Sequence, residues 1–477
     1  MLIEEISIVI CGPVDAGKSS LVGVLTTGEL DDGRGKARKS VFHHSHELET
    51  GRTSSISQNV IKYEVNNNQL KLINTKTNRK YEPRVVDTID MKELEIKNNK
   101  IVSLIDLAGH EKYLKTTVRG ITGMFPDRGI VVIGANTGIT KLTREHIGLL
   151  LCIRIPFIVI ITKIDMAPEQ IYLDLQNNLK KLLQRNAPDK TLYFINNNQN
   201  KNHNNHTNNN HANNNHADYH TDYNHIDNNH ADYHNDLLTN NYIKIVANPD
   251  IVPVISVSNK NGYNINNLHR IIYNIPQRDK FVNQSSKGTI VYLDGNFSVP
   301  GIGLVVSGVI KEGTIKVKQK MFIGPYDGQF LPVVIRSIHN NLREDLLEIG
   351  SNVKGCFAIK FLENSISRTS IKKGFVLIDN VNNWKNNLVK SFVARIKILH
   401  HSSAIESGYC PVVHCGPIKQ SAYMKLLNDT SHLKTGDSSI VSFTFVNHPE
   451  LIEENMIMFF RDGTTKGVGE VVSLIIN

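Results

Sequence analysis

The residues with the clearest chemical signature lie near the N-terminus, where residues 12–19 read G-P-V-D-A-G-K-S and fit the pattern G-x-x-x-x-G-K-[ST]. The apolar run at 6–10 predicts a buried strand before this loop, and residues 20–30 carry apolar side chains at helical spacing after it. Strand, glycine-rich loop and helix form a phosphate cradle, because loop N–H groups and the helix N-terminus face the phosphate oxygens. Lys18 can reach the β- and γ-phosphates, and Ser19 can ligate Mg²⁺. The segment therefore predicts a site for a nucleoside triphosphate.

Three later segments end apolar runs with polar residues that suit the rest of a nucleotide. Asp106 follows the run 101–105 and is expected to hold Mg²⁺ through a water, while Gly109 lets the backbone approach the γ-phosphate. Asp165 closes T-K-I-D and can accept hydrogen bonds from N1–H and N2 of guanine, a donor pair that adenine lacks. The loop after the last strand, S-V-S-N at 256–259, could meet O6 of the base. Together the segments favour GTP over ATP.

The predicted nucleotide contacts all belong to these four segments. They are Gly12, Val14, Asp15, Ala16, Gly17, Lys18, Ser19 and Ser20 in the first, Asp106 and Gly109 in the second, Thr162, Lys163 and Asp165 in the third, and Ser256, Val257 and Ser258 in the last. The expected ligands are GTP or GDP with Mg²⁺. Each segment alone is ordinary among α/β proteins, but their order and spacing along one chain are not.

In that order and spacing, the segments resemble the signatures of translational GTPases related to elongation factor Tu. G-R-T-S-S at 51–55, the run from D-L-A-G-H to K-T-T at 106–117 and T-K-I-D-M at 162–166 resemble more narrowly the group named GTP-binding protein one and two. The resemblance extends over nearly the whole chain. It implies an enzyme that hydrolyses GTP to GDP and phosphate.

The resemblance also assigns roles to single residues. It implies that Thr53 contacts Mg²⁺ and the γ-phosphate, that His110 positions the attacking water, and that Val14 is a hydrophobic gate screening that histidine. Thr162 stands where elongation factors usually carry Asn, which removes one amide contact to the base. Ala16 stands where the wider superfamily often has His.

The sequence allows two roles for His110. A lone histidine after glycine is often a solvated loop residue. Here it lies one residue beyond Gly109, at the head of an expected helix, which favours the catalytic role. Phosphoryl transfer through a loose transition state needs positioning and charge stabilisation rather than a strong base.

The patterns along the chain predict an α/β P-loop GTPase domain followed by two small antiparallel β-barrels. The GTP-binding domain spans 1–283, the first barrel 288–385 and the second 388–477, because short strands separated by Gly turns replace the strand–helix alternation. An Asn/His/Asp-rich tract at 196–241 interrupts the first domain and has almost no aliphatic residues to bury. Its eight histidines suggest metal binding or, more simply, low-complexity drift in a surface loop.

Composition and net charge indicate which kinds of partner the protein can have. The formal net charge is +9, and because the tract at 196–241 is acidic, the positive excess lies in the nucleotide domain and the middle domain. Such a field favours RNA contact, although a generally basic soluble surface would look the same. Five scattered cysteines, and the absence of a signal peptide or an apolar run of membrane-spanning length, predict a reduced, cytoplasmic protein.

Three functions fit these observations. The leading hypothesis is an elongation-factor-like molecular switch that acts, as a monomer, on tRNA or ribosome-bound RNA, with no DNA or membrane partner. An alternative is a GTP-regulated interaction module in RNA decay or ribosome quality control, with slow hydrolysis. A third is a GTPase subunit in sulfate activation, which G-R-T-S-S and H-E-K-Y-L-K-T-T disfavour.

Overall fold

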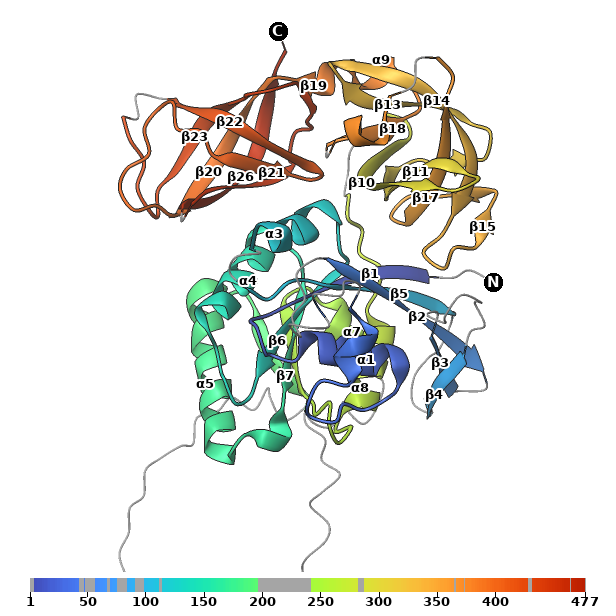
Figure 1. Ribbon diagram of the computed structural model, residues 1–477. Coiled ribbons are helices and arrows are strands. Elements are labelled where there is room, and N and C mark those ends of the chain that lie inside the picture. Colours follow the sequence, from blue (N-terminus) through green and yellow to red (C-terminus); the bar gives the residue numbers. More distant parts are fainter. Residues whose placement is uncertain are drawn as a thin grey trace, which may run out of the picture.

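The computed structural model has a nucleotide domain below two β-barrels, which lie side by side in Figure 1. It describes residues 4–42, 47, 56–66, 69–74, 84–90, 98–110, 114–195, 242–281, 287–363, 366–372, 374–427, 431–463 and 465–476. The insertion at 196–241 and the candidate Thr53 lie outside the described residues. Among the helices of the described ranges, none is long and apolar enough to cross a membrane.

The nucleotide domain is built on a nine-stranded sheet in the order β4-β3-β2-β5-β1-β6-β7-β9-β8. The strands from β5 to β8 in that order run parallel, as the apolar runs predicted, whereas β2, β3 and β4 add an antiparallel edge that was not predicted. The strand bounds are β1 (Glu4–Cys11), β2 (Ser57–Asn66), β3 (Gln69–Asn74), β4 (Arg84–Asp90), β5 (Lys100–Asp106), β6 (Arg128–Gly134), β7 (Phe157–Thr162), β8 (Thr191–Ile195) and β9 (Ile251–Ser256).

Helices cover both faces of this sheet and close two separate cores. One core joins the sheet to α1, α7 and α8, and the other joins it to α3, α4 and α5. Buried strands with a continuous apolar sequence, such as β6 and β7, are typical of a parallel sheet covered on both faces. The helices are α1 (Lys18–Thr27), α3 (Leu114–Gly123), α4 (Lys141–Cys152), α5 (Glu169–Asn186), α7 (Tyr242–Ala247) and α8 (Ile265–Asn274).

Domain 2 is a closed antiparallel barrel with the strand order β13-β18-β10-β11-β17-β14, which the pairing of β13 with β14 completes. Its core is formed by inward-facing aliphatic residues that alternate with polar ones along each strand. Its strands are β10 (Ile290–Val299), β11 (Gly303–Glu312), β12 (Ile315–Lys316), β13 (Lys320–Tyr326), β14 (Gln329–His339), β15 (Asp345–Leu346), β16 (Glu348–Ile349), β17 (Lys354–Phe361) and β18 (Val376–Ile378).

Domain 3 is a second closed barrel, β20-β23-β22-β21-β25-β26, with stacked aromatic residues in its core. The short helix α9 (Val381–Trp384) leads into it from domain 2. Its strands are β19 (Leu388–Val389), β20 (Ser391–His400), β21 (Val412–Cys415), β22 (Ile418–Leu426), β23 (Ser438–Phe445), β24 (Glu450–Leu451), β25 (Ile457–Asp462) and β26 (Thr465–Ile475). The two barrels confirm the predicted fold class.

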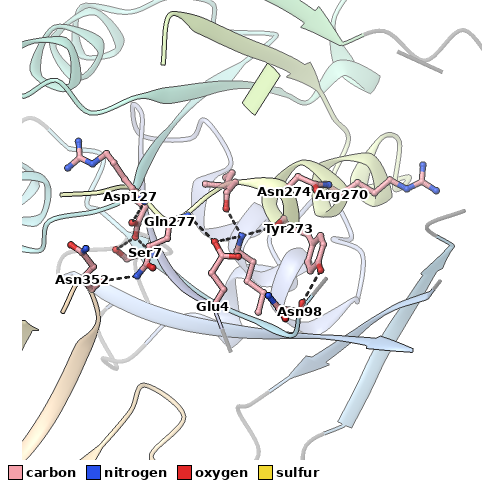
Figure 2. A network of polar contacts seen from close by, with 12 residues as sticks. Glu4, Ser7, Asn98, Asp127, Arg270, Tyr273, Asn274, Gln277 and Asn352 are labelled. Carbon is pink, nitrogen blue, oxygen red and sulfur yellow. Dashed lines mark hydrogen bonds and ion pairs between the residues drawn. The ribbon is translucent and has the colours of Figure 1, made fainter. Parts of the chain in front are cut away.

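The chain that leaves the nucleotide domain is held on both sides by polar contacts at the start of β1 (Figure 2). The N–H of Gln277 donates to Glu4 at 2.9 Å, and its side-chain amide donates to the carbonyl of Asn352 in domain 2 at 3.2 Å. The next N–H, of Arg278, donates to the buried Asp127 at 3.0 Å. The connection therefore joins domain 2 to the side of the nucleotide domain where β1 begins.

A buried cluster joins all three domains directly after α3. The ring of Phe125 stacks on Tyr292 of β10 with centroids 5.2 Å apart and packs against Phe281 at 5.1 Å. Tyr292 donates from its hydroxyl to Glu453 of domain 3 at 2.5 Å, and Lys311 of β11 pairs with the same carboxylate at 2.6 Å. The end of α3, which lies under domain 3 in Figure 1, thus meets the junction of the two barrels.

Candidate nucleotide-binding site

The phosphate loop connects β1 to α1 and depends on two glycines. Gly12 has φ +149° and Gly17 has φ +83°, both outside the range that residues with a Cβ prefer. A Cβ at Gly12 would overlap the carbonyl oxygen of Val132 in β6. Gly17 is the N-cap of α1, so the N-terminus of the helix opens onto the loop. This backbone fits the predicted phosphate cradle.

Lys18 lies at the centre of this cradle. Its side chain is 6% exposed, and its ammonium group donates to the carbonyl of Pro13 at 2.8 Å. Burial lowers the pKa of Lys18, and the nearby carboxylate of Asp106 opposes that shift. Gly109 lies against it so closely that a Cβ there would overlap the ammonium group and lie 2.9 Å from the carbonyl oxygen of Gly12. The structure thus places the predicted γ-phosphate-sensing glycine directly against the phosphate loop.

The two described Mg²⁺ candidates come together. Ser19, in the first turn of α1, donates its hydroxyl to Asp106 at 2.7 Å, and Asp106 is fully buried at the end of β5. A hydroxyl and a carboxylate beside a phosphate cradle are the hard oxygen ligands that suit Mg²⁺. These two residues therefore fit the expected ion.

The remaining residues of the phosphate end are placed as follows. His110 is exposed and follows Gly109 directly, while Val14 in the loop is half-buried. Asp15 is exposed with φ +60°, and Ser20 is half-buried on α1. Their contacts with nucleotide stay predictions.

At the guanine end, two segments far apart in sequence meet through a short hydrogen bond. Asp165 lies in the single 3₁₀ turn η3 (Ile164–Met166), which follows Lys163 in the left-handed region with φ +60°. The hydroxyl of Ser258 donates to Asp165 at 2.6 Å and accepts the N–H groups of Lys260 at 3.2 Å and Asn261 at 3.3 Å. The carboxylate is therefore held in one orientation beside the loop that follows β9.

The other two candidates of that loop are used inside the protein. The hydroxyl of Ser256, at the end of β9, pairs with the hydroxyl of Tyr172 of α5 at 2.8 Å, and Val257 is fully buried. The N–H of Val257 donates to the carbonyl of Ile161 at 2.8 Å and so extends the strand pairing. Of the three predicted residues, only Ser258 reaches Asp165; a role of Ser256 and Val257 in nucleotide contact stays a prediction.

Thr162 connects the two ends of the site. Its hydroxyl donates to the carbonyl of Ala16 in the phosphate loop at 2.6 Å and lies 3.3 Å from the carbonyl of Ile133. The side chain is fully buried at the end of β7. This threonine therefore supports the phosphate loop through the carbonyl of Ala16.

Sequence reasoning missed one residue that shapes the site. Asp31 closes the segment after α1 by accepting the N–H groups of Gly33, Gly35 and Ala37 at 2.9–3.3 Å. The N–H of Asp31 donates to the carbonyl of Asn259 at 2.8 Å, which joins the segment after α1 to the loop that follows β9. A D-D-G turn signals the first contact, but no local pattern signals the second.

The fold and this site define a P-loop GTPase of the translation-factor type. Residues 4–278 match the family model described as the elongation factor Tu GTP binding domain. The chain belongs to that family.

Similarity to known proteins extends through both barrels. The chain is 34% identical to GTP-binding protein 1 of Xenopus laevis, covering 99% of this chain and 64% of that protein. It is 28% identical to human GTP-binding protein 2, covering 98% and 69%. The solved structure of translation elongation factor SelB from Methanococcus maripaludis with the GTP analogue GPPNHP superposes with a TM-score of 0.60 at 17% identity, covering 100% and 80%. The last likeness shows the shared three-domain fold.

Proposed function

We propose that the protein is a cytoplasmic, GTP-driven switch that holds RNA, either tRNA or ribosome-bound RNA, in its GTP state and releases it after hydrolysis. The observation that carries this proposal is the meeting of Lys18, Asp106 and Gly109 at one phosphate loop. The resemblance to elongation factors supplies the RNA part.

Within this proposal the chemistry is simple. Ser19, Asp106 and Thr53 are the residues that would hold Mg²⁺, and the ion would supply positive charge to offset that of the phosphates. Lys18 stabilises the charge that develops on the leaving phosphate oxygens, and His110 orients a water toward the γ-phosphorus. The water forms the new P–O bond as the bond to GDP breaks, and its proton goes to the phosphate released.

Two contacts connect the site to the barrels. Gln58 lies at the start of β2, directly after the segment of about residues 33–57 that we expect to act as switch I. It donates to Asn341 of domain 2 at 3.2 Å and accepts from Lys354 of β17 at 3.2 Å. On the other side, Phe125 follows α3, the helix beyond His110, and stacks at the junction of the barrels. A conformational change before β2 or around His110 could therefore reach the barrels through the contacts of Gln58 or Phe125.

Domain 2 carries an exposed basic face that suits RNA. We define it as Lys318, Lys320, Arg336 and Lys360 on β13, β14, β17 and the turn before β13, all exposed. Lys320 and Lys360 flank Val334 in register across three strands, so their Cα atoms lie about 10 Å apart. Cations gathered on one exposed face can contact the phosphates of a nucleic-acid backbone, whose neutralisation releases counterions.

The basic face gives the proposal a direct test. The triple substitution Lys320→Glu, Arg336→Glu and Lys360→Glu should weaken binding of a labelled tRNA pool at least 10-fold and flatten its salt dependence by about one unit per lost contact. The control reverses three exposed cations of α5, Lys180, Lys181 and Arg185, and should leave binding unchanged. Equal loss in both triple variants would contradict a specific RNA surface on domain 2. Absence of tRNA binding in the unmodified protein would favour the interaction module.

A further inference from the structure

The guanine loop places one more amide in the nucleotide site. Asn259 follows Ser258, the residue bonded to Asp165, and its side chain is 9% exposed. Its Nδ2 lies 3.6 Å from the position that a Cβ on Gly17 would occupy, and the hydroxyl of Thr162 lies 3.5 Å from the same point. The side chains of Thr162 and Asn259 therefore both approach the phosphate loop at Gly17, although nearly a hundred residues separate them in sequence.

The hydroxyl of Thr162 is already engaged there. A threonine hydroxyl has one hydrogen to donate. Thr162 uses it on the carbonyl of Ala16 at 2.6 Å, and no part of the side chain is exposed. The residue that replaces the usual asparagine of elongation factors can brace the phosphate loop but has no donor left for the base.

The side-chain amide of Asn259, in contrast, has unused hydrogen-bonding capacity. Its Oδ1 is buried and has no hydrogen-bond partner within the part of the chain that the structure describes. A buried amide oxygen left unpaired costs free energy, and the O and N ends of an amide are interchangeable by rotation. The backbone is fixed on both sides, since the carbonyl of Asn259 accepts from Asp31 at 2.8 Å and Ser258 is bonded to Asp165. The backbone that carries this amide is thus held by the rest of the site.

We propose that Asn259 is a guanine-binding residue whose amide donates to the O6 and N7 edge of the base. In elongation factors, the asparagine that stands where this chain has Thr162 makes such a base contact. Here Asn259, in the loop after β9, would supply the amide instead. Asp165 accepts from N1–H and N2, which leaves O6 and N7 as the acceptors on the far edge of guanine. Adenine carries an amino donor in place of O6, so a donor amide at this position also rejects adenine.

Calorimetric titration with GDP tests the assignment. Asn259→Ala should weaken GDP about 10-fold, the size expected for one buried hydrogen bond to a ligand. Asn259→Asp, which keeps the shape but presents only acceptors at neutral pH, should weaken GDP at least as much. The control Asn266→Ala removes an exposed amide on α8, eight residues from the loop's Ser258, and should change nothing.

Two base analogues decide whether the amide contacts the base or only braces the loop. The diphosphate of 7-deazaguanosine lacks N7, and that of 2-aminopurine riboside lacks O6 together with the N1–H that Asp165 accepts. The decisive result with either analogue is therefore whether Asn259→Ala causes a further loss. The unmodified protein should bind at least one of them more weakly than GDP, and Asn259→Ala should cause no further loss with that analogue. Unchanged GDP affinity in both Asn259 variants would overturn the proposal, as would an equal loss with GDP and both analogues in correctly folded variants. None of these outcomes depends on RNA binding, so this inference and the proposed function can fail separately.

Discussion

The hydroxyl of Ser258 donates to the carboxylate of Asp165 at 2.6 Å, and this contact orients the carboxylate that we expect to accept from guanine. The two residues lie in loops after neighbouring parallel strands, β7 and β9, whose carboxyl ends meet at the same edge of the sheet. We therefore expect the base specificity to depend on a pair, in which Ser258 orients the carboxylate and Asp165 accepts from the base.

Asp165→Asn should exchange the base preference. The substitution replaces one carboxylate oxygen with a donor that faces the donors of guanine, so GTP affinity should fall by at least 100-fold while xanthosine triphosphate gains affinity. Competition titrations with the two nucleotides measure the exchange. Equal affinity of the unmodified protein for ATP and GTP would be incompatible with this role of Asp165.

His110→Ala should separate catalysis from binding. The side chain is exposed and only orients water in the proposed mechanism, so GTP affinity should change little while turnover falls by roughly 10-fold or more. Single-turnover hydrolysis, with and without ribosomes, measures the effect. His400→Ala, an exposed histidine of β20, is the control, and unchanged turnover in His110→Ala would return His110 to a solvated loop residue.

Gly109→Ala should disable the response to the γ-phosphate. A Cβ at this position overlaps the ammonium group of Lys18, so either the lysine or the switch segment must move away from the phosphates. We expect affinity for a non-hydrolysable GTP analogue to fall about 10-fold more than affinity for GDP. Gly148→Ala in α4, where a Cβ would meet nothing within 4 Å, should bind both nucleotides normally. Equal losses for both nucleotides would contradict a γ-phosphate-specific role.

The contact between the nucleotide domain and domain 2 should depend on pH through Glu5. Burial raises the pKa of Glu5 to about 7, while the hydrogen bond from Asn341 and the charges of Lys280 and Lys354 oppose that rise. An acid whose pKa is raised on folding binds more protons in the folded state, so its stabilisation is complete below pH 4.5 and is lost as pH rises through 7. The melting temperature should therefore fall between about pH 5 and 7, and Glu5→Gln should flatten that part of the profile. An unchanged profile in the variant would rule out Glu5 as the source.

The phosphate end of the site was predictable because its chemistry is local. One loop of eight residues contains both glycines, Lys18 and Ser19, and the flanking strand and helix follow from the apolar pattern. The fold class followed in the same way from strand–helix alternation and then from short strands without helices.

What the sequence left open depends on contacts between distant segments. Strand β2, between β3 and β5, buries Ser57 and Asn59 along with Ile61 and Tyr63, so polar residues interrupt the apolar alternation that would have predicted it. Ser256 and Ser258 are two residues apart and equally suited to a loop, and only the position of Tyr172 on α5 decides which one is free to reach Asp165.

The central claim is that nucleotide state controls RNA affinity, and a titration of aminoacyl-tRNA and of ribosomal complexes in both states tests it most directly. The protein loaded with a non-hydrolysable GTP analogue should bind at least one of these RNAs 10-fold or more tightly than the GDP form, with affinity falling as salt rises. Only differential affinity lets the nucleotide shift the RNA-bound population. The same affinity in both nucleotide states, for every RNA tested, would contradict the switch and leave the GTP-regulated interaction module as the better account.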